Sequence, residues 1–176
     1  CRRLLESAAL IDEDFMEEAV GRLITMALPV VLAITLHEAA HGYMARRCGD
    51  PTAWLAGRIS LNPLKHIDPV GTILIPMIAL TLGGFLFGWA KPVPVDYSRL
   101  RHPRTDMRWV ALAGPGSNLL MAFGWALLLK LGLSTNNYFS VPLEEMARIG
   151  VSINLMLMAI NLVPILPLDG GRVLFS

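Results

Sequence analysis

The sequence has 176 residues and a formal net charge of +1; 54% of the residues are hydrophobic and only 16% are charged, and the mean hydropathy is +0.53. This composition is too apolar for an ordinary soluble domain, so we expect an all-α polytopic membrane protein. The near-neutral charge, without basic runs interleaved with aromatic residues, gives no reason to expect nucleic acid or an acidic partner. The two cysteines, Cys1 and Cys48, do not make a disulfide framework.

Residues 1–22 combine charged side chains with apolar ones at helical spacing. This pattern predicts a short amphipathic helix at the membrane interface, although a solvated leader would fit the same residues. We therefore expect an amphipathic leader over residues 1–22 and a membrane-embedded core over residues 23–176. Because the chain begins at Cys1 and ends at Ser176 just as another apolar run starts, we expect both ends to be cut from a longer protein.

The core contains four apolar runs, at residues 23–43, 70–90, 109–133 and 147–168. The first run is about long enough to span a bilayer of roughly 30 Å as a helix. Between the first two runs, β-branched and aromatic residues surround a glycine from Thr52 to Leu61. That stretch predicts a short strand or hairpin.

The first run contains the sequence Leu36-His37-Glu38-Ala39-Ala40-His41-Gly42, which has the pattern HExxH. On a helix, His37 and His41 project from one face and can bind one metal ion, with Glu38 beside it. Zinc held by imidazoles lowers the pKa of a bound water, and a neighbouring carboxylate can pass the proton to a leaving amine. Chance, or histidines satisfied by other partners, is the alternative. Ionisable groups inside a membrane are functional candidates by default, so we favour a zinc site.

A catalytic zinc usually has three protein ligands, and HExxH supplies two. Asp169 lies at the end of the last run, after Pro164 and Pro167 and before two glycines, and is the best third ligand. A turn residue at a helix end is the alternative for this Asp-Gly pair. His66 and His102 lie in polar loops with prolines, where we expect ordinary solvated histidines.

Asparagine side chains within the apolar runs require polar partners. Asn118 lies near the start of the third run, where it either bonds to substrate backbone or bridges helices. Asn161 lies about two helical turns before Asp169 and could donate a hydrogen bond to a developing oxyanion. A clamp between Asn161 and Asn154 is nearly as good an explanation.

The sequence resembles the site-2 protease family of intramembrane zinc metalloproteases. The resemblance is carried by HEAAHG at 37–42, GPGSN at 114–118 and NLVPILPLDGG at 161–171. The segments at 62–69 and 88–95 are similar to the compact prokaryotic branch, without a PDZ or CBS domain. The resemblance implies one zinc ion on His37, His41 and Asp169, with Glu38 as general base. It also places Asn161 and Asn118 near the metal.

If the HExxH end and Asp169 meet at one zinc ion, the chain between them crosses the membrane an even number of times. One of the three later runs is then not a full crossing. Val70 to Ala90 is interrupted by Pro76 and by Gly83-Gly84, which suits a re-entrant hairpin. We therefore expect three spanning helices, a re-entrant apolar hairpin and a short β segment near the metal site.

The distribution of Lys and Arg predicts the orientation. Residues 45–69 and 91–108 contain nine of these cations, whereas residues 134–146 contain none. By the positive-inside rule the active site faces the cytoplasm, in what we expect to be a bacterial or archaeal cell membrane. Some cations argue mildly against this orientation: Arg2, Arg3, Arg22 and Lys130.

The expected function is hydrolysis of peptide bonds within or next to the transmembrane helices of substrate proteins, as in regulated intramembrane proteolysis. The expected partners are a transmembrane substrate and the lipid bilayer, and the sequence leaves open whether the protein forms a homo-oligomer. One alternative is a non-proteolytic zinc-binding membrane scaffold, against which the presence of Glu38 argues. The other is a metal transporter, for which the apolar runs offer few ionisable groups on the outer side.

Overall fold

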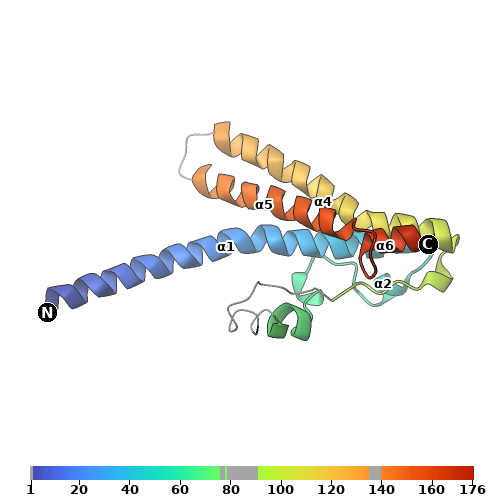
Figure 1. Ribbon diagram of the computed structural model, residues 1–176, viewed down its shortest axis with the longest axis horizontal. Helices are drawn as coiled ribbons and strands as arrows, with labels where there is room; N and C mark the ends of the chain where they lie inside the picture. The colour runs from blue at the N-terminus through green and yellow to red at the C-terminus, as the bar shows by residue number, and fades with distance from the viewer. Residues whose placement is uncertain (1, 76–77, 79–90, 135–139) are drawn as a thin grey trace.

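The computed structural model describes residues 2–75, 78, 91–134 and 140–176, and within these ranges it contains helices and no β-strand. Three long helices form the framework, α1 (Arg2–Arg47), α4 (Pro103–Ser134) and α5 (Ser140–Asn161) (Figure 1). The remaining elements are short: α2 (Thr52–Leu55), η1 (Pro63–Lys65), η2 (Pro69–Leu74), η3 (Tyr97–Arg99) and α6 (Asp169–Phe175).

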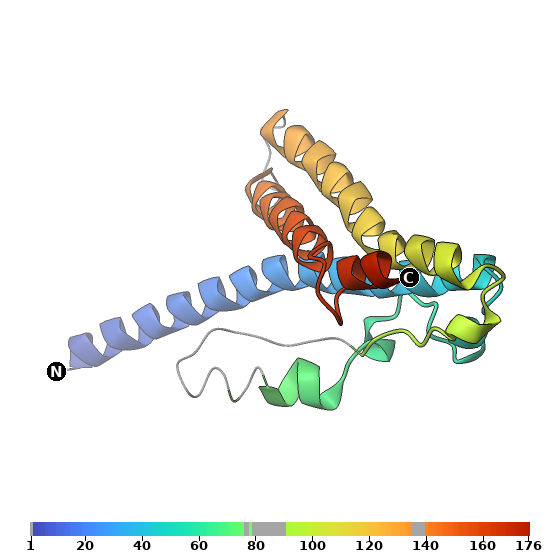
Figure 2. The same ribbon diagram turned by 45° about the vertical axis from the view of Figure 1, so that its right-hand side comes forward.

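Helix α1 is continuous over 46 residues, so the boundary expected at residue 22 lies inside it. Its C-terminal half packs against α4 and α5, while its N-terminal part extends away from them (Figures 1 and 2). The cationic side chains of Arg46 and Arg47 in the last turn interact favourably with the negative end of the helix dipole. The helix ends just before Gly49, whose φ of 110° is a conformation that glycine adopts readily.

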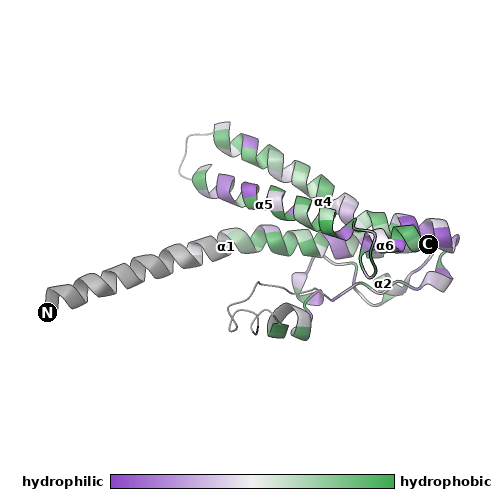
Figure 3. Cartoon of the chain, viewed as in Figure 1, coloured by the Kyte–Doolittle hydropathy of each residue, from purple (hydrophilic) through white to green (hydrophobic). Residues whose placement is uncertain are grey.

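Helices α4 and α5 form an antiparallel pair that contacts one side of α1 and then rises away from it (Figure 2). A Cβ at Gly150 of α5 would collide with the indole ring of Trp125 on α4, so this glycine sets how closely the two helices approach. Apart from Val110 and Trp125, the buried side chains of α4 are small or polar, whereas most of its large apolar side chains are exposed, and Figure 3 shows how much of both helices is hydrophobic. These exposed side chains include Leu120, Phe123, Leu127, Leu131 and Leu133.

The described segments between α1 and α4 lie on the opposite side of α1 from α5 (Figures 1 and 2). Asp50 is fully buried and ties them together, because its carboxylate accepts hydrogen bonds from the backbone N–H groups of Thr52 at 2.9 Å and Asp96 at 2.7 Å. The N–H of Arg101 also donates to the carbonyl of Cys48 at 3.0 Å. The chain is thereby brought back across α1 before α4 begins.

The strand expected from Thr52 to Leu61 is wrong. Residues Thr52–Leu55 form helix α2, and Gly57 at a φ of 64° reverses the chain directly after it. The Asp50 carboxylate caps the N–H of Thr52, and Pro51 has a φ of −85° close to the helical range. This local capping outweighs the β-propensity of the side chains.

The membrane topology is tested only in part. Among the described helices, α4 alone has both the length and the apolar composition to cross a membrane. Most of the expected hairpin from Val70 to Ala90 lies outside the described residues; its start belongs to η2, a π-helical turn capped by the carboxylate of Asp68. The three spans and the hairpin remain predictions.

Candidate metal centre

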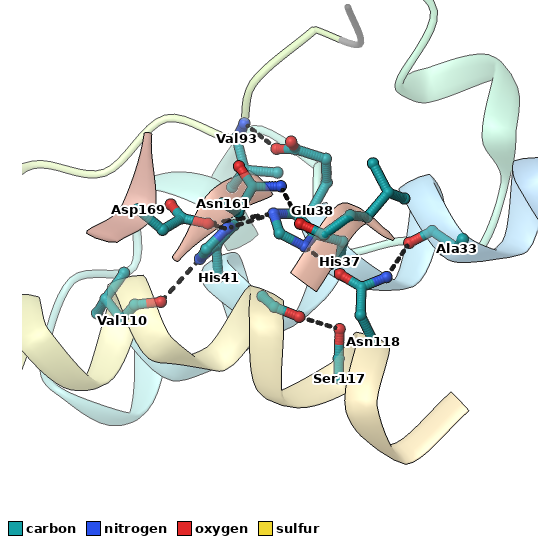
Figure 4. A network of polar contacts seen from close by, with 12 residues as sticks. Ala33, His37, Glu38, His41, Val93, Val110, Ser117, Asn118, Asn161 and Asp169 are labelled. Carbon is teal, nitrogen blue, oxygen red and sulfur yellow. Dashed lines mark hydrogen bonds and ion pairs between the residues drawn. The ribbon is translucent and has the colours of Figure 1, made fainter. Parts of the chain in front are cut away.

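Three buried side chains from opposite ends of the chain converge on one point (Figure 4). The Nε2 atoms of His37 and His41 lie 3.1 Å apart. Asp169 Oδ2 lies 3.3 Å from Nε2 of His37 and 3.2 Å from Nε2 of His41. The two histidines are one turn apart on α1, whereas Asp169 is the first residue of α6.

The segment between α5 and α6 carries Asp169 to the histidines. Helix α5 ends at Asn161, earlier than the run to residue 168 suggested, and Asp169 therefore begins a new helix instead of ending the previous one. Because the two prolines in this segment cannot donate backbone hydrogen bonds, they favour the break. The segment folds tightly on α6, since a Cβ at Gly170 would collide with the main chain of Leu162 and one at Gly171 would lie 2.6 Å from the carbonyl carbon of Ile165.

Hydrogen bonds on the far side of each ring determine which imidazole nitrogen carries the proton. His41 Nδ1 lies 2.7 Å from the carbonyl oxygen of Val110, which can only accept, so Nδ1 donates. His37 Nδ1 lies 2.6 Å from Oδ1 of Asn118, which likewise accepts. The lone pairs of both Nε2 atoms therefore face Asp169, as metal coordination requires.

The three atoms that face one another, the two histidine Nε2 atoms and Asp169 Oδ2, are all hydrogen-bond acceptors. Asp169 Oδ2 is buried and has no hydrogen-bond donor, because each Nε2 that faces it carries a lone pair. Three such acceptors repel one another unless a cation lies between them. Ligand atoms about 2.0–2.1 Å from a tetrahedral zinc ion lie about 3.3–3.4 Å apart, close to the separations here. These three atoms and the distances between them thus fit the coordination of zinc.

Gly114 of α4 forms one wall of this centre. A Cβ built on it would lie 2.5 Å from Cε1 of His41 and 2.6 Å from Cε1 of His37. Any larger residue would occupy the space of the imidazole rings. The first glycine of the GPGSN motif therefore leaves room for the two histidines.

Glu38 faces the segment that returns from the other side of α1. Its Oε2 accepts a hydrogen bond of 2.9 Å from the backbone N–H of Val93, a buried residue between two prolines. Gly42 lets this segment lie close to α1, because a Cβ there would lie 3.1 Å from Cγ1 of Val93 and 3.0 Å from Cγ1 of Ile59. A carboxylate can accept about four hydrogen bonds, so the bond to Val93 leaves Glu38 able to bind a water.

The two asparagines expected near the metal, Asn118 and Asn161, have different hydrogen-bond partners. Asn118 is fully buried and bonds to His37, to the carbonyl of Ala33 and to Asn154, so it bridges three helices. Asn161 instead donates to the carbonyl of Leu157 at 3.0 Å in its own helix. The clamp expected between Asn161 and Asn154 is not formed, because the Asn154 side chain pairs with Asn118.

The other two histidines considered as ligands lie outside the cluster of His37, His41 and Asp169. His66 is buried, contrary to the expectation of a solvated ring, and its Nε2 lies 2.9 Å from the carbonyl oxygen of Ser60. His102 is exposed and begins the turn before α4. His66 thus has a structural partner within its own loop.

Sequence comparison relates the chain to bacterial proteins. It is 42% identical over 153 residues to a protein of Bacillus subtilis named "Putative zinc metalloprotease YwhC", covering 85% of this chain and 67% of that one. It is 31% identical over 156 residues to "Putative zinc metalloprotease Rip2" of Mycolicibacterium smegmatis, covering 86% and 56%. A protein of the same name in Mycobacterium tuberculosis is 29% identical over 145 residues, covering 80% and 52%.

The chain therefore spans 67% of the Bacillus relative and little more than half of the mycobacterial ones. No protein-family model matches the sequence, and no solved structure matches it.

Proposed function

Since the chain belongs to the site-2 protease family, we propose that it is a zinc metalloendopeptidase that hydrolyses peptide bonds within or next to the transmembrane helices of other proteins. The single observation that carries this proposal is the convergence of His37, His41 and Asp169 as three acceptors, with Glu38 adjacent in the sequence. A site that only binds metal has no need of a carboxylate at that position.

Each residue of the centre has a distinct task. His37 and His41 would hold one zinc ion through Nε2, and Asp169 would hold it through Oδ2. When bound, zinc lowers the pKa of a water and polarises the scissile carbonyl. Glu38 takes the proton of the attacking water and delivers it to the amine that leaves. The N–H of Val93 orients Glu38 for this transfer.

The packing of α4 supports a membrane location. The side chains that it buries are mostly small or polar, and most of its large apolar side chains face outward, as expected for a helix surrounded by lipid. We propose a multi-pass protein of the bacterial or archaeal cell membrane, with the zinc centre toward the cytoplasm on the grounds of the Lys and Arg distribution.

The substrate would be a transmembrane protein whose helix unwinds locally, because helical hydrogen bonds otherwise hide its carbonyls. Helix-breaking residues near the cleaved bond should therefore favour hydrolysis. Residues 54–61 contain no strand with which the unwound substrate would pair.

Cleavage of a panel of transmembrane peptides in liposomes tests the proposal, with the wild type compared to Glu38→Gln. We expect hydrolysis by the wild type, none by the variant, and zinc in both. Zinc in both proteins without hydrolysis of any peptide would contradict the protease and favour the scaffold. Uptake of labelled zinc into the same liposomes would favour the transporter instead.

A further inference from the structure

A series of buried hydrogen bonds connects the metal centre to helix α5, which contributes no ligand. It runs from His37 on α1 to the amide of Asn118 on α4, and from there to the amide of Asn154 on α5. Both asparagines are fully buried. An amide in such a place must satisfy its donors and its acceptor within the protein.

Two backbone carbonyls fix which way the amides point. The Gly150 carbonyl can only accept, so the atom of Asn154 that lies 2.8 Å from it is Nδ2, and its Oδ1 faces Asn118. In the same way, the carbonyl of Ala33 lies 3.3 Å from Nδ2 of Asn118. Both hydrogens of that Nδ2 are then used, one toward Ala33 and one toward Asn154 at 2.9 Å.

The orientation of the two amides determines which ring nitrogen of His37 carries the proton. Since Asn118 turns Nδ2 toward Asn154, its Oδ1 must face His37 Nδ1 at 2.6 Å, and that nitrogen must donate. If Asn118 were flipped, its NH2 group would face Nδ1 and leave the proton on Nε2, where it would block the metal. The shorter of the two bonds that prevent the flip is the one to Asn154.

We propose that Asn154 is a positioning residue that acts through Asn118 to hold His37 with its proton on Nδ1 and its Nε2 lone pair toward the metal. Gly150 supports this role in two ways. Its carbonyl orients the Asn154 amide, and its lack of a side chain lets α5 approach Trp125 of α4 closely enough for the two asparagines to meet. Helix α5 thus prepares a site to which it gives no ligand.

The decisive comparison is between Asn154→Leu and Asn154→Asp, which have nearly the same shape. Leucine removes the acceptor that Asn118 uses. An aspartate keeps an acceptor oxygen for Asn118 whether or not it is protonated, and in the protonated form its O–H can replace the N–H that donates to Gly150. A merely structural role in packing would affect both variants alike, whereas the positioning role predicts that they differ.

The inference rests on the proposed metal site, but its first measurement needs neither metal nor substrate. The sequence contains four histidines, so ¹⁵N-histidine NMR of the metal-free protein at alkaline pH can report the proton on each ring. The His37→Asn variant identifies the His37 signal. We expect Nδ1–H in the wild type and in Asn154→Asp, and a shift of His37 toward Nε2–H in Asn154→Leu.

Zinc affinity, measured by competition with a chelator, is the second readout. Removing an outer partner of a metal-binding histidine costs about 10- to 100-fold in affinity, so we expect about tenfold weaker binding in Asn154→Leu and less than about threefold in Asn154→Asp. If the leucine variant does not fold, Asn154→Ala removes the same acceptor.

Three results would overturn the inference. These are a wild-type His37 without a proton on Nδ1, an unchanged tautomer in the variants that lack the acceptor, and an equal loss of affinity in the leucine and aspartate variants. A protein with the expected tautomers and zinc affinities but no peptide hydrolysis would contradict the proposed protease and leave the role of Asn154 intact.

Discussion

Replacement of Gly114 by alanine should damage the metal centre without changing any ligand. A Cβ at this position would lie 2.6 Å from Cε1 of His37, whereas ordinary contact begins at 3.4 Å, so the atoms must separate by at least 3.4 − 2.6 = 0.8 Å. Metal–ligand distances tolerate only about ±0.2 Å. Either α4 moves away or the imidazole rings turn, and both responses disturb the ligand geometry.

We expect Gly114→Ala to weaken zinc binding by about 10- to 100-fold, the range found when a ligand loses its support, or about 1.4–2.8 kcal/mol. Chelator competition measures the affinity, and cobalt substitution reports the ligand geometry through its visible spectrum. Hydrolysis should fall in parallel.

Gly116→Ala is the matched control, because it lies in the same helix and motif and a Cβ there meets nothing within 4 Å. Alanine is a better helix former than glycine by about 1 kcal/mol, so this variant should bind zinc normally and be no less stable. Normal zinc affinity in Gly114→Ala, or an equal loss in both variants, would refute the steric reasoning.

Other variants separate the tasks of the remaining groups. Asp169→Asn removes the anionic ligand and should lower zinc affinity at least about 100-fold while the helices stay folded, as circular dichroism would show; affinity like that of the wild type would remove Asp169 from the ligand set. Gly42→Ala pushes against Val93 and should reduce kcat about tenfold through Glu38 while zinc content is kept, since each positioned acid–base group contributes about 10²–10⁴-fold; a loss of zinc instead would show that the change reaches the metal centre. Burial raises the pKa of the Cys48 thiol, with Asp106 adding to the shift, so less thiolate forms at a given pH and alkylation near pH 8 should be slower than that of glutathione. Equal alkylation rates would contradict that pKa direction.

The cluster of His37, His41 and Asp169 could be predicted from the sequence because its chemistry is local. Two histidines at helical spacing need a third ligand, and Asp169 is placed among prolines and glycines where a helix must break. The helix does break before Asp169, but it breaks earlier than expected, since α5 ends at Asn161 and not at residue 168. Pattern alone shows where apolar character continues, not where the chain stops being helical.

The hydrogen-bond partners of these side chains and of Glu38 could not be predicted in the same way. The groups that orient His41 and Glu38 are the carbonyl of Val110 and the N–H of Val93, and backbone groups of this kind leave no trace in the sequence. The strand expected near residue 55 was wrong because a single capping carboxylate decided the local structure. Asn154 was considered only as a partner of Asn161, since its meeting with Asn118 depends on how α4 and α5 pack.

X-ray absorption at the zinc edge of the purified protein, together with its zinc content, tests the central claim most directly. The arrangement of His37, His41 and Asp169 predicts one zinc ion per chain, with two imidazole nitrogens and oxygen neighbours at about 2.0–2.2 Å. A sulfur neighbour at about 2.3 Å, or a protein that binds no zinc when it is supplied, would contradict the account of this metal centre.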